Sequence, residues 1–238
     1  TDRTMSDRAG QVWAVIAGGG TSGHVHPALA IAGELVSRGR SKDEIHFIGS
    51  ARGLESELVP ARGYALTALP GRGIERTINL ENVKSIAALG LASFHAWRTL
   101  RRLAPAVVVS VGGYASLPAL QAAAVLRIPI IVTEQNTVPG AANRFGSRWA
   151  KACAVAFAST ELPNKVHTGN PLLGSILDID RSNQIAVAEA KDRLGVESGR
   201  QLVAAFGGSL GARRINQAVV DATTMLADRS DVAVRHII

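Results

Sequence analysis

Short apolar segments rich in β-branched residues alternate with longer segments of helical pattern along most of this chain. Parallel strands that are buried on both faces are continuous apolar runs, so the short segments are predicted strands. These strands span residues 12–17, 44–48, 64–69, 106–110, 129–133, 153–157, 202–206 and 232–238. The predicted helices span residues 27–38, 54–62, 79–103, 116–127, 141–150, 184–194 and 212–227. This alternation predicts an α/β fold built on parallel sheets.

The chain is long enough for two domains, since a typical domain has about 100–200 residues. Prolines and glycines recur between residues 161 and 180, as in a linker, and a new strand, glycine-rich turn and helix follow. We expect the second domain to be incomplete. The expected parts are a disordered tail at 1–10, a Rossmann-like domain at 11–163, a linker at 164–180 and the start of a second domain at 181–238.

The net charge of +7 favours binding to polyanions, which include anionic lipid, phosphate-bearing substrates and nucleic acid. Aromatic residues make up only 4% of the chain and no nucleic-acid motif is present, so we expect no nucleic-acid partner. Cys153 is the single cysteine, which excludes an intramolecular disulfide and fits a reducing compartment.

No apolar stretch reaches the roughly 18 residues that a membrane-spanning helix needs, and the first ten residues are polar rather than signal-like. These features predict a cytoplasmic protein. The histidines are scattered without the spacing of metal ligands, so we expect no metal site and no cofactor.

Glycine-rich turns follow three of the predicted strands, at residues 18–23, 111–116 and 206–212. Each lies between a strand and a helix, where backbone amides and a helix N-terminus can receive a phosphate group. The first turn lacks the Gly-Lys-Ser/Thr ending of a Walker loop and fits a dinucleotide fingerprint only loosely. A tight turn without a ligand is the alternative for any one of them. Together they predict three anion-accepting turns along the crevice edge of the sheets.

His24 closes the first glycine-rich turn, just before the predicted helix at 27–38. A helix N-terminus disfavours the charged imidazolium, so the ring should stay neutral and available as a base. A lone histidine at such a place is more often a hydrogen-bonding loop residue, but the neighbouring phosphate-type turn favours a catalytic role.

The segment at residues 19–30 resembles the opening loop of the MurG family of N-acetylglucosaminyltransferases. Further matches in the same order are Arg52-Gly53-Leu54-Glu55, Gly112-Gly113-Tyr114, Glu134-Gln135-Asn136, Gly169-Asn170-Pro171 and Gly207-Gly208-Ser209. The resemblance covers nearly the whole chain from Val12, and the joint spacing of the motifs makes it specific.

The resemblance implies a GT-B architecture, in which two Rossmann-like domains face a cleft. It implies inverting transfer of N-acetylglucosamine (GlcNAc) from UDP-GlcNAc to the muramoyl 4-hydroxyl of lipid I, which is undecaprenyl-pyrophosphoryl-MurNAc-pentapeptide. The product is lipid II, a precursor of peptidoglycan. It also implies a peripheral position on the cytoplasmic face of the cell membrane. We expect the present chain to be inactive alone, because most of the donor pocket would lie beyond Ile238.

The resemblance also assigns roles to individual residues. His24 is the candidate general base. The donor-binding residues it implies are Thr21, Ser22, Gly23, Asn136 and Ser209. The residues implied for the acceptor pyrophosphate are Gly20, Gly112, Gly113 and Tyr114.

The chain departs from the family pattern at several of these motifs. Ser22 replaces a usual glycine, His26 an aromatic residue and Leu210 a glutamine. Thr133 replaces a histidine, and Leu173 stands where the family has a donor-binding arginine. Two alternatives therefore stay open: a GT-B transferase with another sugar or lipid acceptor, and, for this chain alone, a non-catalytic module that binds pyrophosphate or lipid.

The predicted helix at 79–103 carries an apolar strip beside several cations. The strip consists of Ile86, Leu89, Phe94 and Trp97, with Arg98 among the neighbouring cations. Such a strip faces the protein core or an anionic membrane surface. The resemblance favours the membrane, because residues 94–98 are similar to the bilayer-contact helix proposed for the family.

Overall fold

The structure is a computed structural model that describes residues 11–70, 80–208 and 212–237, with the backbone alone for residues 80–87. The chain divides into two compact units, Thr1–Leu177 and Asp178–Ile238. The first unit holds the larger sheet. The linker expected at 164–180 includes a short strand of that sheet, β7 (Lys165–His167), and the division between the units falls after Leu177.

The first unit is built on a seven-stranded sheet whose strands are all parallel. Its strands are β1 (Ala14–Gly18), β2 (Ile45–Ser50), β3 (Ala65–Leu69), β4 (Val107–Gly112), β5 (Ile130–Glu134), β6 (Ala152–Val155) and β7. They lie in the order β3-β2-β1-β4-β5-β6-β7. The predicted α/β, Rossmann-like fold class is confirmed.

The strand order reverses direction between β1 and β4, which lie side by side in the sheet. The chain leaves β1 toward one edge and leaves β4 toward the other, so the connections after these two strands diverge. A crevice opens at such a point, outside the carboxyl ends of the strands, and open α/β sheets bind ligands there. The first two glycine-rich turns follow these two strands.

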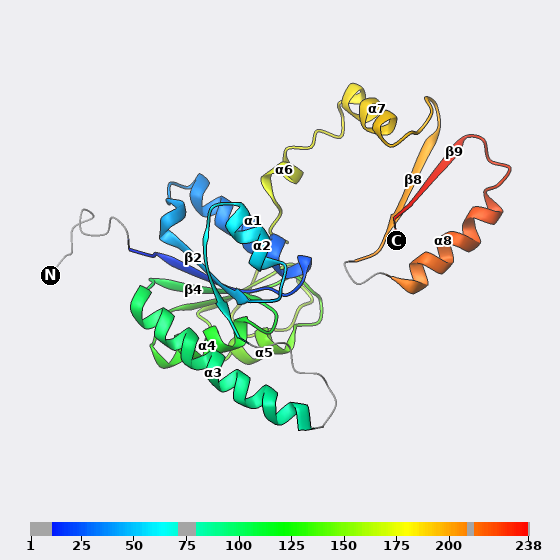
Figure 1. Cartoon of the computed structure of the whole chain (residues 1–238). Coiled ribbons are helices and arrows are strands. Elements are labelled where there is room, and N and C mark those ends of the chain that lie inside the picture. The colour runs from blue at the N-terminus through cyan, green and yellow to red at the C-terminus, as the bar shows by residue number, and fades with distance from the viewer. Residues whose placement is uncertain (1–10, 71–79, 209–211, 238) are drawn as a thin grey trace. The chain divides into compact units, whose positions relative to one another are not determined.

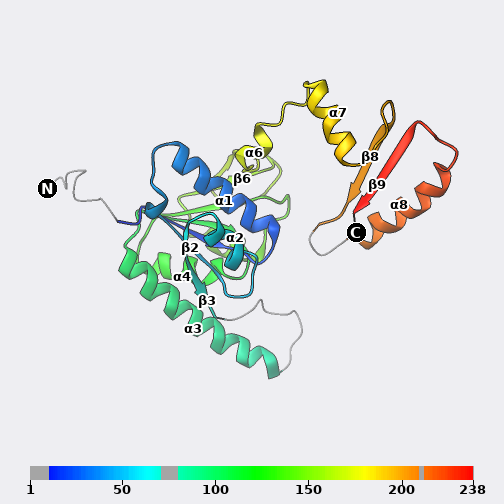
Figure 2. The same cartoon turned by 45° about the horizontal axis from the view of Figure 1, so that its top comes forward.

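Helices cover both faces of the sheet, with α1 and α3 on opposite sides of it in Figure 1 and Figure 2. The helices of this unit are α1 (Ser22–Ser37), α2 (Glu55–Ala61), α3 (Leu80–Leu103), α4 (Ser116–Val125), α5 (Ala141–Gly146) and α6 (Gly174–Leu177), with a 3-10 turn at Lys42–Glu44. Both faces of the central strands β1, β2, β4 and β5 are therefore buried, which explains their continuous apolar sequences.

Alternate residues of each strand enter two separate apolar clusters, as the two-residue period of a strand requires. On β1, Val15 and Ala17 pack in the cluster with α3 and α4, whereas Ile16 packs in the cluster with α1 and α2. All five residues of β1 are buried. The central strand β1 is therefore held by packing on both faces, and this fixes the point at which the first glycine-rich turn leaves the sheet.

Helix α1 begins at Ser22, five residues before the start predicted from Pro27. The sequence rule places proline in the first turn of a helix, because it has no N–H to donate. Here Pro27 lies in the second turn and cannot donate to the carbonyl group of Gly23. The correction puts His24 inside the first turn of the helix rather than in the loop before it.

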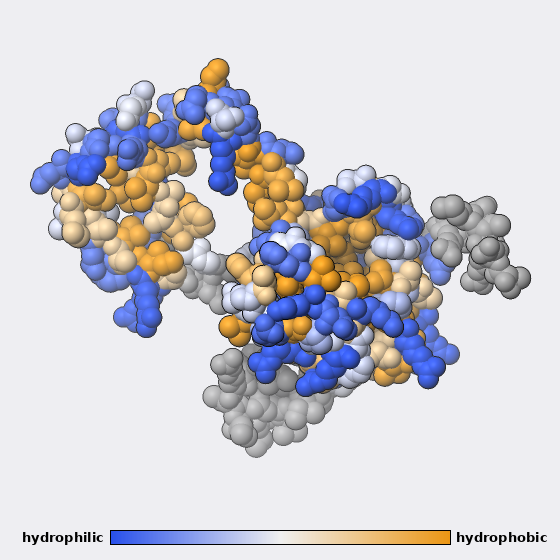
Figure 3. Space-filling view, turned by 180° about the vertical axis from the view of Figure 1, so that it is seen from behind, coloured by the Kyte–Doolittle hydropathy of each residue, from blue (hydrophilic) through white to orange (hydrophobic). Residues whose placement is uncertain are grey.

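The second unit contains a two-stranded parallel sheet and two helices. Its elements are α7 (Gln184–Arg193), β8 (Gln201–Phe206), α8 (Arg213–Met225) and β9 (Val232–Ile237). Large apolar side chains such as Phe206, Val220 and Met225 are exposed here, and apolar residues are visible on this unit in Figure 3. None of the described helices is long and apolar enough to cross a membrane.

His46 on β2 is a buried titratable group of the fold. Its Nε2 lies 2.8 Å from Oγ1 of Thr67 on β3. Burial, and secondarily the charge of Arg102, lower the pKa of His46 from its ordinary 6.5. Below pH 6.5 the unfolded chain binds a proton that the folded chain still excludes, so the free energy of unfolding should fall as the pH drops.

We predict that His46→Gln makes the stability of the first unit less dependent on pH. Denaturant unfolding would be followed by tryptophan fluorescence at about pH 7.5 and about pH 5.5. Trp13, Trp97 and Trp149 all lie in the first unit. The unmodified chain should lose more stability between the two pH values than the variant. Equal losses in both proteins would contradict this role of His46.

Candidate functional site

The turns after β1 and β4 touch each other at the crevice. The amide of Gly19 donates to the carbonyl oxygen of Gly112 at 3.3 Å. A side chain on Gly113 would overlap the carbonyl oxygen of Gly19, and its φ of +84° also favours glycine. A side chain on Gly112 would come within 3.1 Å of the His24 ring. Glycine at these positions lets the two turns and His24 meet.

The N-terminus of α1 opens into this crevice. Thr21 is the N-cap residue, but its side chain makes no capping hydrogen bond to the helix. The first amides of a helix have no acceptor within it, so those of Ser22 and Gly23 are open to a ligand. The helix dipole adds partial positive charge at the same place, which suits a phosphate group.

The ring of His24 is half-buried at this helix end. Its Nδ1 lies 3.1 Å from Oγ1 of Thr21. Burial lowers the pKa of His24, although the negative charges of Glu134 and Glu55 act in the opposite direction. The lowered pKa favours the neutral ring expected from the sequence, and burial is its largest cause.

Glu134, at the end of β5, is a buried carboxylate whose two oxygens are fully occupied. Oε1 accepts from the backbone amide and the side-chain Nδ2 of Asn136, at 3.0 and 2.9 Å. Oε2 accepts from the amide of Gly140 at 2.9 Å and from Nδ2 of Asn143 at 3.0 Å. Glu134 therefore holds the loop after β5 and orients two amide side chains beside the crevice.

Asn143 on α5 connects this network to β4. Its Oδ1 accepts from Oγ of Ser110 at 3.0 Å, and its Nδ2 also donates to the carbonyl oxygen of Thr133 at 2.9 Å. The Ser110 hydroxyl in turn accepts from the amide of Gly112 at 3.3 Å. A continuous set of hydrogen bonds thus runs from the second glycine-rich turn to Glu134.

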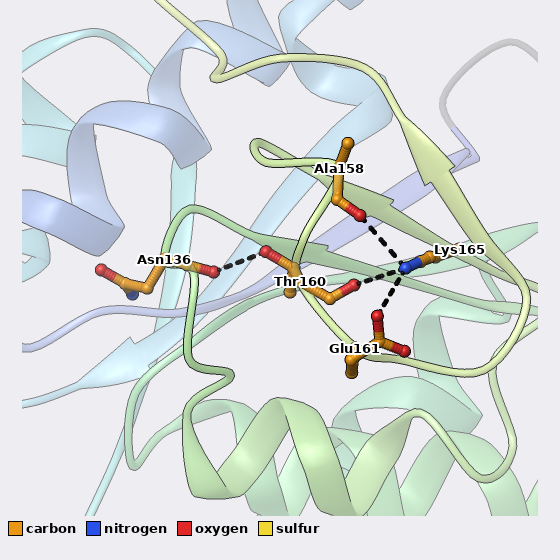
Figure 4. A network of polar contacts seen from close by, with 5 residues as sticks. All are labelled: Asn136, Ala158, Thr160, Glu161 and Lys165. Carbon is orange, nitrogen blue, oxygen red and sulfur yellow. Dashed lines mark hydrogen bonds and ion pairs between the residues drawn. The ribbon is translucent and has the colours of Figure 1, made fainter.

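A second network reaches the backbone of Asn136 (Figure 4). The carbonyl oxygen of Asn136 accepts from Oγ1 of Thr160 at 3.0 Å. Lys165 on β7 donates to the carbonyl oxygens of Ala158 and Thr160 and to the carboxylate of Glu161, at 3.1, 3.2 and 2.9 Å. Strand β7, which the sequence did not predict, therefore supports Asn136, which the sequence singled out as a donor-binding residue.

Two pockets open at this end of the sheet, with volumes of about 500 and about 460 Å³. The first is lined by the second glycine-rich turn and by apolar residues of α4 and α5, including Leu117 and Phe145. The second is lined by Thr21, Ser22 and Gly23 and by residues 170–172. His24 and Asn136 belong to both pockets, so these two side chains form the boundary between them.

Tyr114 also lines the first pocket. Among the described residues no group hydrogen-bonds its buried hydroxyl, and burial raises its pKa. A buried hydroxyl without a partner costs about 1–3 kcal/mol, so a ligand that supplies one would be favoured.

The structure brings together most of the residues that the sequence singled out at the crevice. Gly20 differs: it lines neither pocket, and its amide donates to the carboxylate of Glu55 at 2.7 Å. Ser209 and the side chain of Ile86 lie outside the described residues. Among the described residues, no group of three or more His, Cys, Asp or Glu is placed to hold a metal ion.

No role for Glu55, Glu134 or Asn143 is predicted from the sequence. A role for Glu134 could have been predicted, because a carboxylate at the end of an otherwise apolar strand is rarely buried unless it has bonding partners. Leu173, which stands at the family's arginine position, packs against the apolar cluster of α1 and α2. It therefore offers no charge to a phosphate.

The strip expected on α3 divides between core and surface. Ala92, Ala96 and Leu100 are fully buried against the sheet, whereas Phe94 is 55% exposed and Arg98 is exposed. Leu89 and Trp97 are half-buried. The Phe94 and Trp97 rings stack with centroids 6.0 Å apart, and Arg101 lies over Trp97. The outward face thus combines aromatic rings with cations, and none of the residues named here lines either pocket.

Known proteins are similar to this chain in sequence and in fold. The chain is 39% identical over 212 residues to the UDP-N-acetylglucosamine--N-acetylmuramyl-(pentapeptide) pyrophosphoryl-undecaprenol N-acetylglucosamine transferase of Ruminiclostridium cellulolyticum, covering 87% of this chain and 56% of that protein. It is 43% identical over 213 residues to the protein of the same name from Frankia casuarinae, covering 90% and 56%. The chain thus spans little more than half the length of these curated relatives.

A crystal structure of MurG from Acinetobacter baumannii has the same fold, with a TM-score of 0.65 and 24% identity over 94% of this chain and 67% of that one. The relatives confirm the resemblance to the MurG family that the motifs predicted. Residues 14–155 match the glycosyltransferase family 28 N-terminal domain. The chain therefore belongs to glycosyltransferase family 28, of which it carries the N-terminal domain.

Proposed function

We propose that the full-length protein with this sequence is an inverting glycosyltransferase of peptidoglycan synthesis. It transfers GlcNAc from UDP-GlcNAc to the muramoyl 4-hydroxyl of lipid I and so makes lipid II. One observation carries the proposal beyond the names of the relatives: His24, whose pKa is lowered by burial, stands on the boundary between the first, partly apolar pocket and the second pocket at the open end of α1.

In this proposal His24 is the general base. For Nε2 to accept a proton, the neutral ring must carry its hydrogen on Nδ1, where Oγ1 of Thr21 at 3.1 Å can accept it. Nε2 then removes the proton of the acceptor hydroxyl while that oxygen bonds to the anomeric carbon of GlcNAc. The bond from this carbon to UDP breaks on the opposite face, UDP leaves with the electron pair, and the configuration inverts.

The two pockets divide the substrates between them. The acceptor occupies the first pocket, where Gly112, Gly113 and Tyr114 face its pyrophosphate and the apolar lining faces the start of its lipid. The donor sugar and diphosphate reach the second pocket, beside Thr21 and the open amides of Ser22 and Gly23. Asn136, which lines both pockets, contacts the transferred sugar.

Donor binding also needs residues outside the described ones. We propose that Ser209 contacts UDP, as the family resemblance implies. A cation other than residue 173 must meet the donor charge, since Leu173 packs in an apolar cluster. Without such a cation, a GT-B transferase that uses another sugar or lipid acceptor fits the site better.

We further propose that the protein works at an anionic membrane surface, because its acceptor is anchored in lipid. The outward face of α3, with Phe94 and Arg98, is the contact on the described part of the chain. Aromatic side chains beside cations suit the interface of an anionic bilayer.

We predict that His24→Ala in the full-length protein lowers kcat about 10²- to 10⁴-fold, the usual effect of losing a general base. The KM for UDP-GlcNAc should change little, because the ring acts on the acceptor. Radiolabelled UDP-GlcNAc with a lipid I analogue measures both. His167→Ala is the matched control, since His167 on β7 is exposed and lines neither pocket. Unchanged kcat in His24→Ala would remove the base assignment, and no labelled lipid from the unmodified enzyme would refute the reaction.

We predict that Phe94→Glu weakens binding to vesicles containing anionic phospholipid about tenfold or more, from the loss of roughly 1.5–3 kcal/mol of apolar burial. Co-sedimentation of this chain with such vesicles measures the effect. Ile185→Glu is the control, because Ile185 is 74% exposed on α7, in the second unit. Equal binding by both variants would argue against membrane contact through α3.

A further inference from the structure

Glu55 is a buried carboxylate that faces the back of the first glycine-rich turn. Only 2% of its surface is exposed, and it lies in the first turn of α2. Its Oε2 accepts from the amide of Gly20 at 2.7 Å, and its Oε1 accepts from the amide of Ser50 at 2.6 Å. Hydrogen bonds of this length are typical of charged acceptors, which compensate for the loss of water.

Three glycines surround this carboxylate and leave no room for any side chain of their own. A Cβ atom on Gly19, Gly49 or Gly53 would overlap the Glu55 side chain. The φ angles of Gly49 and Gly53 lie outside the left-handed region, so their backbone conformations do not require glycine. Space for the carboxylate is the remaining reason for glycine at these two positions. The chain is thus built around Glu55 on three sides.

The residues that Glu55 holds lead directly to the site. Gly20 precedes Thr21, whose hydroxyl contacts the His24 ring, and α1 begins one residue later. On its other side the same turn is bonded to Gly112 through Gly19. The first turn is therefore held between the Glu55 carboxylate, which lines neither pocket, and the second glycine-rich turn, which lines the first pocket.

We propose that Glu55 is a positioning residue for the transfer reaction, whose carboxylate fixes the first glycine-rich turn and thereby sets Thr21, His24 and the open end of α1 in the crevice. The inference rests on the proposed function for its kinetic consequence. The role needs a carboxylate, because two N–H groups converge on its two oxygens. In a glutamine one of these oxygens is replaced by an NH₂ group, which cannot accept either bond.

The first test uses this chain and does not depend on catalysis. Hydrogen exchange followed by NMR should show the Gly20 amide protected, and the Gly23 amide, which has no acceptor in the helix, exchanging faster. Glu55→Gln should shift the ring signals of His24, whereas Glu57→Gln should not. Glu57 is the matched control, because it lies two residues away on α2 and is exposed. Unprotected Gly20 or an unmoved His24 ring would overturn the proposal.

The second test measures turnover in the full-length protein. Glu55→Gln should lower kcat about 10- to 100-fold, since a displacement of about 1 Å in catalytic groups costs that order of rate. The KM for UDP-GlcNAc should change less than about threefold. Gly53→Ala should lower kcat in the same way, because the added methyl group would push the Glu55 carboxylate out of place. Gly53 itself lines neither pocket. Turnover equal to that of Glu57→Gln in either variant would contradict the positioning role.

Glu55→Asp separates geometry from charge. The shorter side chain keeps a negative charge near His24 but cannot reach both amides. The carboxylates that act on His24 are Glu134 from β5 and Glu55 from α2, and both oppose the lowering of its pKa by burial. Loss of the Glu55 charge should therefore move the acid limb of kcat/KM to lower pH in Glu55→Gln but not in Glu55→Asp.

The kinetic outcomes are decisive in both directions. A lowered kcat with an unmoved acid limb in Glu55→Asp supports positioning by the two hydrogen bonds. Full turnover in Glu55→Asp would show that charge alone matters and overturn it. Thermal unfolding of each variant shows whether that variant still folds. If a variant does not fold, protection of the Gly20 amide in the unmodified chain decides whether Glu55 holds the turn. An inactive unmodified enzyme would refute the proposed function but leave the NMR test of Glu55 intact.

Discussion

The close approach of two glycine turns, after β1 and β4, is the contact on which the rest of the site depends. The Gly19 amide bonds to the Gly112 carbonyl oxygen, and any side chain on Gly113 would separate the turns. The strand order makes this contact possible, because β1 and β4 are neighbours whose connections diverge. The helix that follows each turn then begins at the crevice, and His24 comes to lie between two pockets.

Buried carboxylates hold both walls of this crevice. Glu55 fixes the first turn from behind, and Glu134 fixes the loop after β5 together with Asn136 and Asn143. Neither has a cation within bonding distance among the described ion pairs, and both are compensated by N–H donors. Both carboxylates oppose the lowering of the His24 pKa by burial.

The sequence predicted the parallel sheet and the crevice turns because these depend on local apolar runs and glycines. It placed the start of α1 too late, since Pro27 lies in the second turn rather than the first. It did not predict β7, whose three exposed residues have no apolar pattern. The roles of Glu55 and Asn143 were not predicted either, because each bonds a residue far away along the chain. Gly20 lies 35 residues from Glu55, and Ser110 lies 33 residues from Asn143.

We propose that His24 is a neutral general base whose Nε2 faces the two pockets. NMR of the ¹⁵N-labelled imidazole at about pH 7 tests it most directly, because the nitrogen shifts report both charge and tautomer. The expected result is a neutral ring with its hydrogen on Nδ1, donated to Thr21, and a bare Nε2. A charged ring, or a neutral ring with its hydrogen on Nε2, would contradict it.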